Sequence, residues 1–170
     1  MSCPPQLVLF EVELFIPSAS SDLPNPDVTI HTGGFCQSNP GSGGWAAIVE
    51  TKNRSVELSG AECMTTNYRI GLRSVIEAVK CVPRDASARV LSDSKYVVKG
   101  MNEWLTKWVC NDWVTSTVAP VKNRDLWEEL CGLLCERQYR AYWIPGHYGY
   151  PQNERCHQLA TQATVAHWEC

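Results

Sequence analysis

The residues with the clearest chemical potential lie where short apolar runs end. Residues 29–45, TIHTGGFCQSNPGSGGW, have the form of a first hairpin, with a β-branched run, a Gly-Gly turn and an aromatic segment. A strand end of this kind usually presents a carboxylate, but Thr32, Gly33 and Gly34 supply none. Asp93 follows a second apolar run, ARVLS, and His147 follows a third, so acid–base or metal chemistry is the kind to consider.

Cysteine is the other reactive residue type, and the chain has nine. Cys131 and Cys135 are one helical turn apart and Cys156 precedes His157, but no Cys-x-x-Cys pair indicates a zinc site. Buried apolar thiols are the favoured interpretation. The odd number, the scattering and the lack of a signal peptide predict reduced thiols and an intracellular location, in the cytoplasm or nucleus.

Composition predicts one globular domain. The chain has 170 residues, of which 44% are hydrophobic, which is enough for a proper core. The net charge of −3 gives no overall attraction toward nucleic acid, so a nucleic-acid binder would need a local basic patch.

The N-terminal residues LVLFEVELFIP are too short to span a membrane and alternate apolar residues with Glu11 and Glu13. This alternation predicts a strand, which would pair with a sheet edge of its own chain or of a second copy in a homodimer. Residues 17–27 are turn-rich. We therefore expect an extension and linker over residues 1–26 and the main domain over 27–168.

The main domain alternates strands and helices after an initial run of strands. Strands are predicted over 28–32, 45–52, 54–61, 88–94 (ending in a polar turn) and 139–147, and helices over 68–82, 96–108, 125–136 and 152–168. Three strands followed by alternating helices and strands predict an α/β fold, with a mixed sheet and helices on its faces.

Several motifs in this order resemble the type 1 ribonucleases H. The similar segments are TGGFCQSNPGSGGW (32–45), TTNYRIGL (65–72), LSDSKYVVKGMNEWL (91–105), PVKNRDLWEEL (120–130) and WIPGHYGYPQNERCHQLA (143–160). The resemblance covers most of residues 28–165. It implies the ribonuclease H-like fold, with a five-stranded mixed sheet flanked by helices.

The resemblance also implies a site with four carboxylates. Family members cut the RNA strand of an RNA–DNA hybrid by two-metal hydrolysis, in which oxygen ligands hold two Mg²⁺ ions. The four acidic positions correspond here to Gly33, Gly71, Asp93 and His157, so three carboxylates are missing. Because one carboxylate cannot hold two ions, we predict loss of the Mg²⁺ site, no metal ligands and no catalytic residues.

Other acidic residues could supply a reorganised metal site. Glu62 precedes the first expected helix, Glu77 lies in its later part, and Glu154 lies one turn before His157. None is at a position where the family places a ligand, so this alternative ranks below loss of the site.

The segment that follows the third acidic position is not basic. In the family a basic helix and loop grips the DNA strand, whereas residues 101–121 carry Lys107 against Glu103 and Asp112. Such a surface gains little from counterion release. The tryptophans of this segment predict packing between helix and loop rather than stacking with bases or a partner; they are Trp104, Trp108 and Trp113.

Some binding features of the family persist. Asn39, Thr66 and Asn67 match hybrid-contacting positions, although Tyr68 follows where the family usually has Asn. Small polar residues serve equally as turn formers and helix caps, so both roles stay open. Lys95 could contact a phosphate, and His147 matches a family histidine that would be vestigial without metals.

These observations favour a pseudoenzyme that acts as a protein-interaction or scaffold module. A protein partner would dock on the old active face or the N-terminal strand, with weak or no binding to nucleic acid and none to membranes. Two alternatives remain. One is a non-cleaving binder of RNA–DNA hybrids or double-stranded RNA, and the other is a ribonuclease H with a reorganised metal site.

Overall fold

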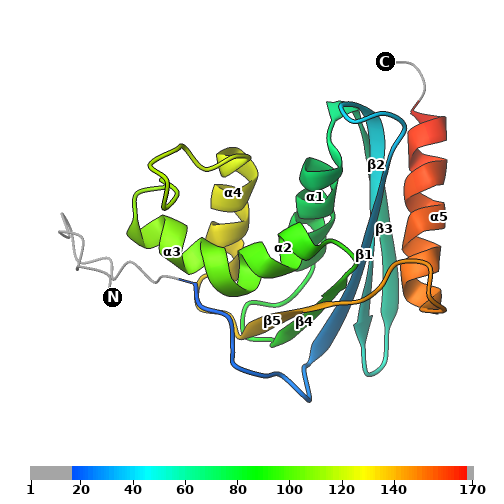
Figure 1. The fold of residues 1–170 in the computed structure, drawn as a ribbon. Coiled ribbons are helices and arrows are strands. Elements are labelled where there is room, and N and C mark those ends of the chain that lie inside the picture. The colour runs from blue at the N-terminus through cyan, green and yellow to red at the C-terminus, as the bar shows by residue number, and fades with distance from the viewer. Residues whose placement is uncertain (1–16, 168–170) are drawn as a thin grey trace.

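The computed structural model describes residues 17–167 and contains one five-stranded sheet (Figure 1). The strand order is β3-β2-β1-β4-β5. The strands are β1 (Val28–Cys36), β2 (Gly41–Thr51), β3 (Ser55–Thr65), β4 (Ala88–Ser92) and β5 (Tyr139–Trp143). The predicted N-terminal strand lies outside the described residues, so its pairing stays a prediction.

The sheet is mixed, as the order of elements predicts. The first three strands form an antiparallel meander, and β1, β4 and β5 run parallel to one another. Side chains of β2 alternate between two cores: Ala47 and Val49 join the larger one, while Ala46 and Ile48 join a smaller one with Cys156. The sheet is therefore buried on both faces at its centre.

Helices cover both faces of the sheet (Figure 1). On one side α5 lies along the meander, and on the other α1 packs beside α4. The helices are α1 (Asn67–Lys80), α2 (Lys95–Lys99), a π-helical segment η1 (Gly100–Trp104), α3 (Leu105–Cys110), α4 (Arg124–Leu134) and α5 (Pro151–Ala166). This architecture confirms the predicted fold class. No helix within residues 17–167 is long and apolar enough to cross a bilayer.

The helix predicted over 96–108 is present but is interrupted by the π turn. The ring of Trp127 packs directly on Gly100, where a Cβ atom would overlap the indole. The wider turn begins at this glycine, which no periodicity in the sequence indicates.

The segment predicted as a linker lies against β4 and β5. The Ser20 amide donates to the carbonyl of Tyr139 at 2.8 Å, and the Leu23 amide donates to the Tyr142 hydroxyl at 3.0 Å. The Arg89 guanidinium donates to the Leu23 carbonyl at 2.7 Å. Residues 17–27 are thus bound to the sheet, while a domain boundary at 26/27 stays a prediction.

Helix α5 approaches β1 more closely than any side chain would allow. A Cβ atom on Gly33 would lie 2.8 Å from Cys156 Cβ and 3.3 Å from the His157 amide nitrogen. At Gly71, within α1, a Cβ atom would instead meet a Val97 methyl group at 3.1 Å. The contact at Gly33 is with the Cβ atom of Cys156, which is fixed to the helix backbone and can move only if α5 moves.

These contacts predict different effects for two matched substitutions, a loss of stability at Gly33 and little change at Gly71. Gly33→Ala forces α5 away from β1 and should lower the free energy of unfolding by about 1–3 kcal/mol. Gly71→Ala gains up to about 1 kcal/mol of helix propensity, which offsets the tighter methyl contact. Urea denaturation of both variants measures the difference, and equal stability of the two would contradict the close packing at Gly33.

Candidate functional site

The four positions that correspond to the family's carboxylates meet in one cleft. Gly33 of β1, Gly71 of α1, Asp93 after β4 and His157 of α5 all line it. The cleft has a volume of about 290 Å³. The structure therefore brings together residues that are up to 124 positions apart in the sequence, the distance from Gly33 to His157.

A contact between Asp93 and His157 dominates the chemistry of the cleft. His157 Nε2 lies 2.8 Å from Asp93 Oδ2, and each side chain is about three-quarters buried. The hydrogen bond to Asp93 raises the pKa of His157 above its ordinary value, against the effect of burial. Burial opposes ionisation of Asp93, but the hydrogen bond and charge of His157 outweigh it and lower the pKa of Asp93. The two groups therefore form an ion pair.

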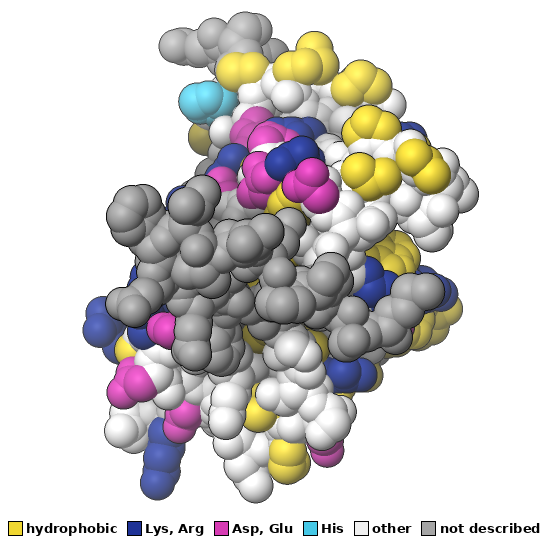
Figure 2. Space-filling view, turned by 90° about the vertical axis from the view of Figure 1, so that its left-hand side faces the viewer, with side chains coloured by type: hydrophobic (Ala, Val, Ile, Leu, Met, Phe, Trp, Pro, Cys, Tyr) yellow, Lys and Arg dark blue, Asp and Glu magenta, His cyan; other side chains and the backbone are white. Residues whose placement is uncertain are grey.

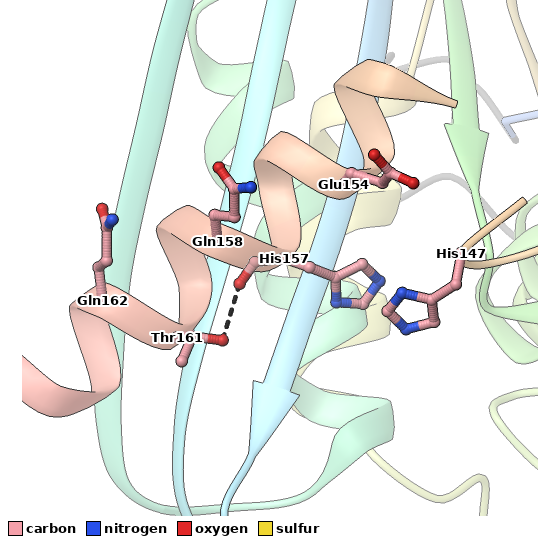
Figure 3. A pocket seen from close by; sticks show the side chains of 6 residues that line it. All are labelled: His147, Glu154, His157, Gln158, Thr161 and Gln162. Carbon is pink, nitrogen blue, oxygen red and sulfur yellow. Dashed lines mark hydrogen bonds between the residues drawn. The ribbon is translucent and has the colours of Figure 1, made fainter. Parts of the chain in front are cut away.

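A second imidazole lies beside this pair. The rings of His147 and His157 are stacked, with centroids 4.8 Å apart and an interplanar angle of 25°. His147 is exposed on the loop between β5 and α5, and its backbone has a φ of 61°. Figure 3 shows the His157 ring pointing from the side of α5 toward the ring of His147 on the neighbouring loop. One imidazole is thus held by Asp93, and the other remains accessible to solvent.

The cleft does not fit a two-ion metal site. Asp93 is the single carboxylate among its lining residues. No group of three or more His, Cys, Asp or Glu side chains within residues 17–167 is placed to hold a metal ion. Glu62 and Glu77 instead pair with Arg73, at 3.2 and 3.5 Å. The side chains present therefore do not supply the ligands that two Mg²⁺ ions require.

Most of the predicted nucleic-acid contacts shape the start of α1. The Asn67 amide donates to Asn39 Oδ1 at 3.2 Å, and Thr66 caps the helix by accepting from the Arg69 amide at 3.3 Å. The capping role is thus present, and Asn39 and Asn67 are also exposed. Lys95 is exposed on α2 rather than in the cleft, with Nζ 4.7 Å from the centre of the Trp143 ring.

The tryptophans of residues 101–121 pack as predicted. Trp104 and Trp108 lie 5.6 Å apart, and Trp108 meets Trp127 edge to face at 5.3 Å. Sequence reasoning missed Trp143, which is 46% exposed and donates from Nε1 to the backbone carbonyl of Asp93 at 3.0 Å. An aromatic residue at the end of a strand that neighbours the Asp93 strand was the available signal.

Positive charge around the cleft is largely paired. Arg69 forms two hydrogen bonds to Asp125, at 2.9 and 2.7 Å, and Arg73 contacts Glu129 at 3.2 Å. On the opposite side from α5, the face drawn in Figure 2 also shows basic side chains lying beside acidic ones. Arg69 and Arg73 are therefore not free cations at the start of α1.

Burial dominates the chemistry of two cysteines. It raises the pKa of the Cys131 and Cys156 thiols to about 12, so these thiols stay protonated and are poor metal ligands. The reduced state of the cysteines stays a prediction.

The ion pair predicts a specific pH dependence of stability. The raised pKa of His157 stabilises the fold fully below its ordinary value of 6.5, and this contribution is lost as pH rises through the folded-state pKa. The lowered pKa of Asp93 contributes above its ordinary value of 3.8 and is lost as pH falls through the folded-state value. The pair is thus most stabilising between these two pH values.

Urea denaturation at about pH 6 and about pH 9 should therefore show a larger loss of stability for the wild type than for Asp93→Asn. Groups that titrate in both proteins cancel in this comparison. An identical loss in the two proteins would show that the pair does not form.

Comparison with known proteins places the whole arrangement in one family. The RNase H family model matches residues 25–165. The ribonuclease H of Zymomonas mobilis is 42% identical over 139 residues, which are 82% of this chain and 89% of the relative. The ribonuclease H of Cupriavidus necator is 43% identical over 136 residues, which are 80% of this chain and 94% of the relative.

Solved structures agree. LC9-RNase H1, a type 1 RNase H with the type 2 active-site motif, superposes with a TM-score of 0.73 at 31% identity. The superposed region is 86% of this chain and 75% of the LC9-RNase H1 chain. LC11-RNase H1 in complex with an RNA/DNA hybrid superposes with a TM-score of 0.60 at 21% identity. The superposed region is 82% of this chain and 97% of the LC11-RNase H1 chain, and this similarity supports the fold.

These relatives overturn several sequence predictions. The prediction of a scaffold pseudoenzyme without enzymatic activity is contradicted, because relatives about 42% identical over most of the chain are ribonucleases H. The prediction of a chain without Mg²⁺ is contradicted by the same family match. The predictions of a protein partner and of weak nucleic-acid binding are also contradicted, because these relatives are ribonucleases H.

The errors share one origin. The missing carboxylates and the net charge exclude the family's usual arrangement of ligands, but they do not exclude activity in a chain about 42% identical to ribonucleases H. The fold, the family model and the relatives agree over nearly the same residues, and the chain belongs to the RNase H family.

Proposed function

We propose that this chain acts as a ribonuclease H on the RNA strand of RNA–DNA hybrids, through a reorganised site. The observation that carries the proposal is the Asp93–His157 pair, which lies in the cleft where β1, α1, β4 and α5 meet. Family membership supports the substrate class, and a solved structural neighbour is itself bound to an RNA/DNA hybrid.

The side chains of the cleft have separable roles in this proposal. Asp93 is ionised and presents its second carboxylate oxygen to orient a water molecule toward a phosphorus atom. His157 holds Asp93 in place and balances its charge beside the phosphate. His147 is exposed next to this pair and donates a proton to the leaving ribose oxygen, while the attacking water releases its own proton to solvent, from which His147 is reprotonated. These roles involve no metal ion, because the side chains within residues 17–167 do not fit a two-ion site.

Cleavage of a labelled hybrid tests the proposal. Gel analysis should show that the wild type cuts the RNA strand, and the assay is run with Mg²⁺, with Mn²⁺ and with a chelator. Asp93→Asn should reduce the rate by about 10²-fold or more, because it removes the group that orients the water molecule. His147→Ala should also slow the reaction, by less than Asp93→Asn, since solvent can replace an exposed proton donor.

Asp85→Asn is the matched control, because Asp85 is exposed in the turn between α1 and β4, away from the cleft. It should cleave at the wild-type rate after the same purification. If no protein cuts the hybrid under any of the three conditions, or if Asp93→Asn is as active as Asp85→Asn, the proposed function is wrong.

A further inference from the structure

Tyr68 is an exposed aromatic residue inside the cleft. It is the second residue of α1, its side chain contributes to the cleft that Asp93 and His157 line, and it is 55% exposed. A single exposed aromatic residue is common on protein surfaces. Tyr68 differs from such residues in two ways: it lines the cleft, and its ring is packed against a second aromatic ring.

The ring of Tyr68 is stacked on a second tyrosine. Its centroid lies 4.1 Å from that of Tyr96, with an interplanar angle of 20°. Tyr96 is held in turn by its hydroxyl group, which accepts hydrogen bonds from Trp127 Nε1 at 2.9 Å and from Asn123 Nδ2 at 3.1 Å. Trp104 contacts Tyr96 from the side at 6.0 Å. One ring face of Tyr68 is therefore backed by a fixed aromatic cluster.

The backbone that carries Tyr68 is also fixed. Thr66 caps α1, and Asn39 of the β1–β2 loop accepts from the Asn67 amide. Arg69, the next residue, is bound to Asp125 of α4 through both terminal nitrogens. The ring consequently loses little conformational freedom when a ligand binds, which favours affinity.

An aromatic ring with one face packed against the protein and the other face exposed can stack on a planar ligand such as a nucleobase. Stacking of a nucleobase on an aromatic side chain contributes about 1–3 kcal/mol and tolerates any base. Within a continuous duplex each base face is covered by its neighbours, so this contact requires a base that is unpaired or at a strand end. Because Arg69 and Arg73 are already paired with acids, stacking can supply affinity that phosphate contacts do not.

We propose that Tyr68 is a stacking platform for an unpaired nucleobase, so that this chain prefers RNA–DNA hybrids that border single-stranded nucleotides over continuous hybrids. This inference rests on the proposed function, because it names the form of hybrid that the same cleft selects. Tyr68 positions the strand relative to Asp93 and takes no part in bond breaking.

Fluorescence anisotropy measures the preference. A blunt RNA–DNA hybrid and the same hybrid with a single-stranded overhang are titrated with the full chain in chelator, and gels confirm that the RNA stays intact. The wild type should bind the overhang substrate about fivefold to about a hundredfold more tightly than the blunt one. Tyr68→Ala should remove this difference, whereas Tyr68→Phe, which keeps the ring, should retain it.

Tyr148→Ala is the matched control, since Tyr148 is 78% exposed and does not line the cleft. It should keep the wild-type preference, and circular dichroism should show that all variants are folded. Equal binding of both substrates by the wild type, or an equal loss in Tyr68→Ala and Tyr148→Ala, would overturn the inference. Hybrid binding without any cleavage would overturn the proposed function alone, whereas a lack of binding to both substrates would overturn both.

Discussion

The close contact between α5 and β1 is the constraint on which the site depends. Gly33 has no side chain, so Cys156 of α5 packs directly against the strand, and the adjacent His157 reaches Asp93. Cys156 is fully buried, and its thiol donates to the backbone carbonyl of His31 at 3.5 Å, which adds a polar link between helix and strand. Gly33 therefore has two effects: it supplies no carboxylate, and it lets α5 come close enough for His157 to pair with Asp93.

The electrostatics of the cleft follow from this packing. A site with four converging carboxylates needs cations to offset their mutual repulsion. Here a single carboxylate is paired with an imidazolium inside the protein, so the cleft holds much less uncompensated negative charge. An anionic substrate strand can approach such a cleft with less repulsion, and the requirement for a strongly basic flanking loop falls accordingly.

Aromatic packing connects the cleft to the rest of the α1 side of the sheet. Trp127 lies on Gly100, donates to the Tyr96 hydroxyl and contacts Trp108, so one buried indole supports both the π turn and the ring beneath Tyr68. Segments that are separate in the sequence therefore act as one rigid support. Trp108 and Trp127 do not line the cleft, but through this aromatic cluster they hold Tyr68 in place.

The sequence by itself determined the order and type of the elements. Alternating β-branched residues predict the strands, helical spacing predicts α1, α4 and α5, and the motifs from Thr32 to Ala160 indicate the family. These signals are local in the chain, so they can be read without coordinates. The π turn at Gly100 was not predicted, because it depends on the distant Trp127 ring.

Only the tertiary structure decided what the altered site residues do. The sequence shows that Gly33, Gly71 and His157 are not acidic, but it does not show that His157 pairs with Asp93 or that His147 stacks on it. Nor does it show that Tyr68 rests on Tyr96. These contacts join residues from different elements, and their distances are set by how closely α5, α1 and the β5–α5 loop pack on the sheet. Packing distance is a property of the folded chain as a whole, which is why the chemistry of this cleft could not be derived from residue types alone.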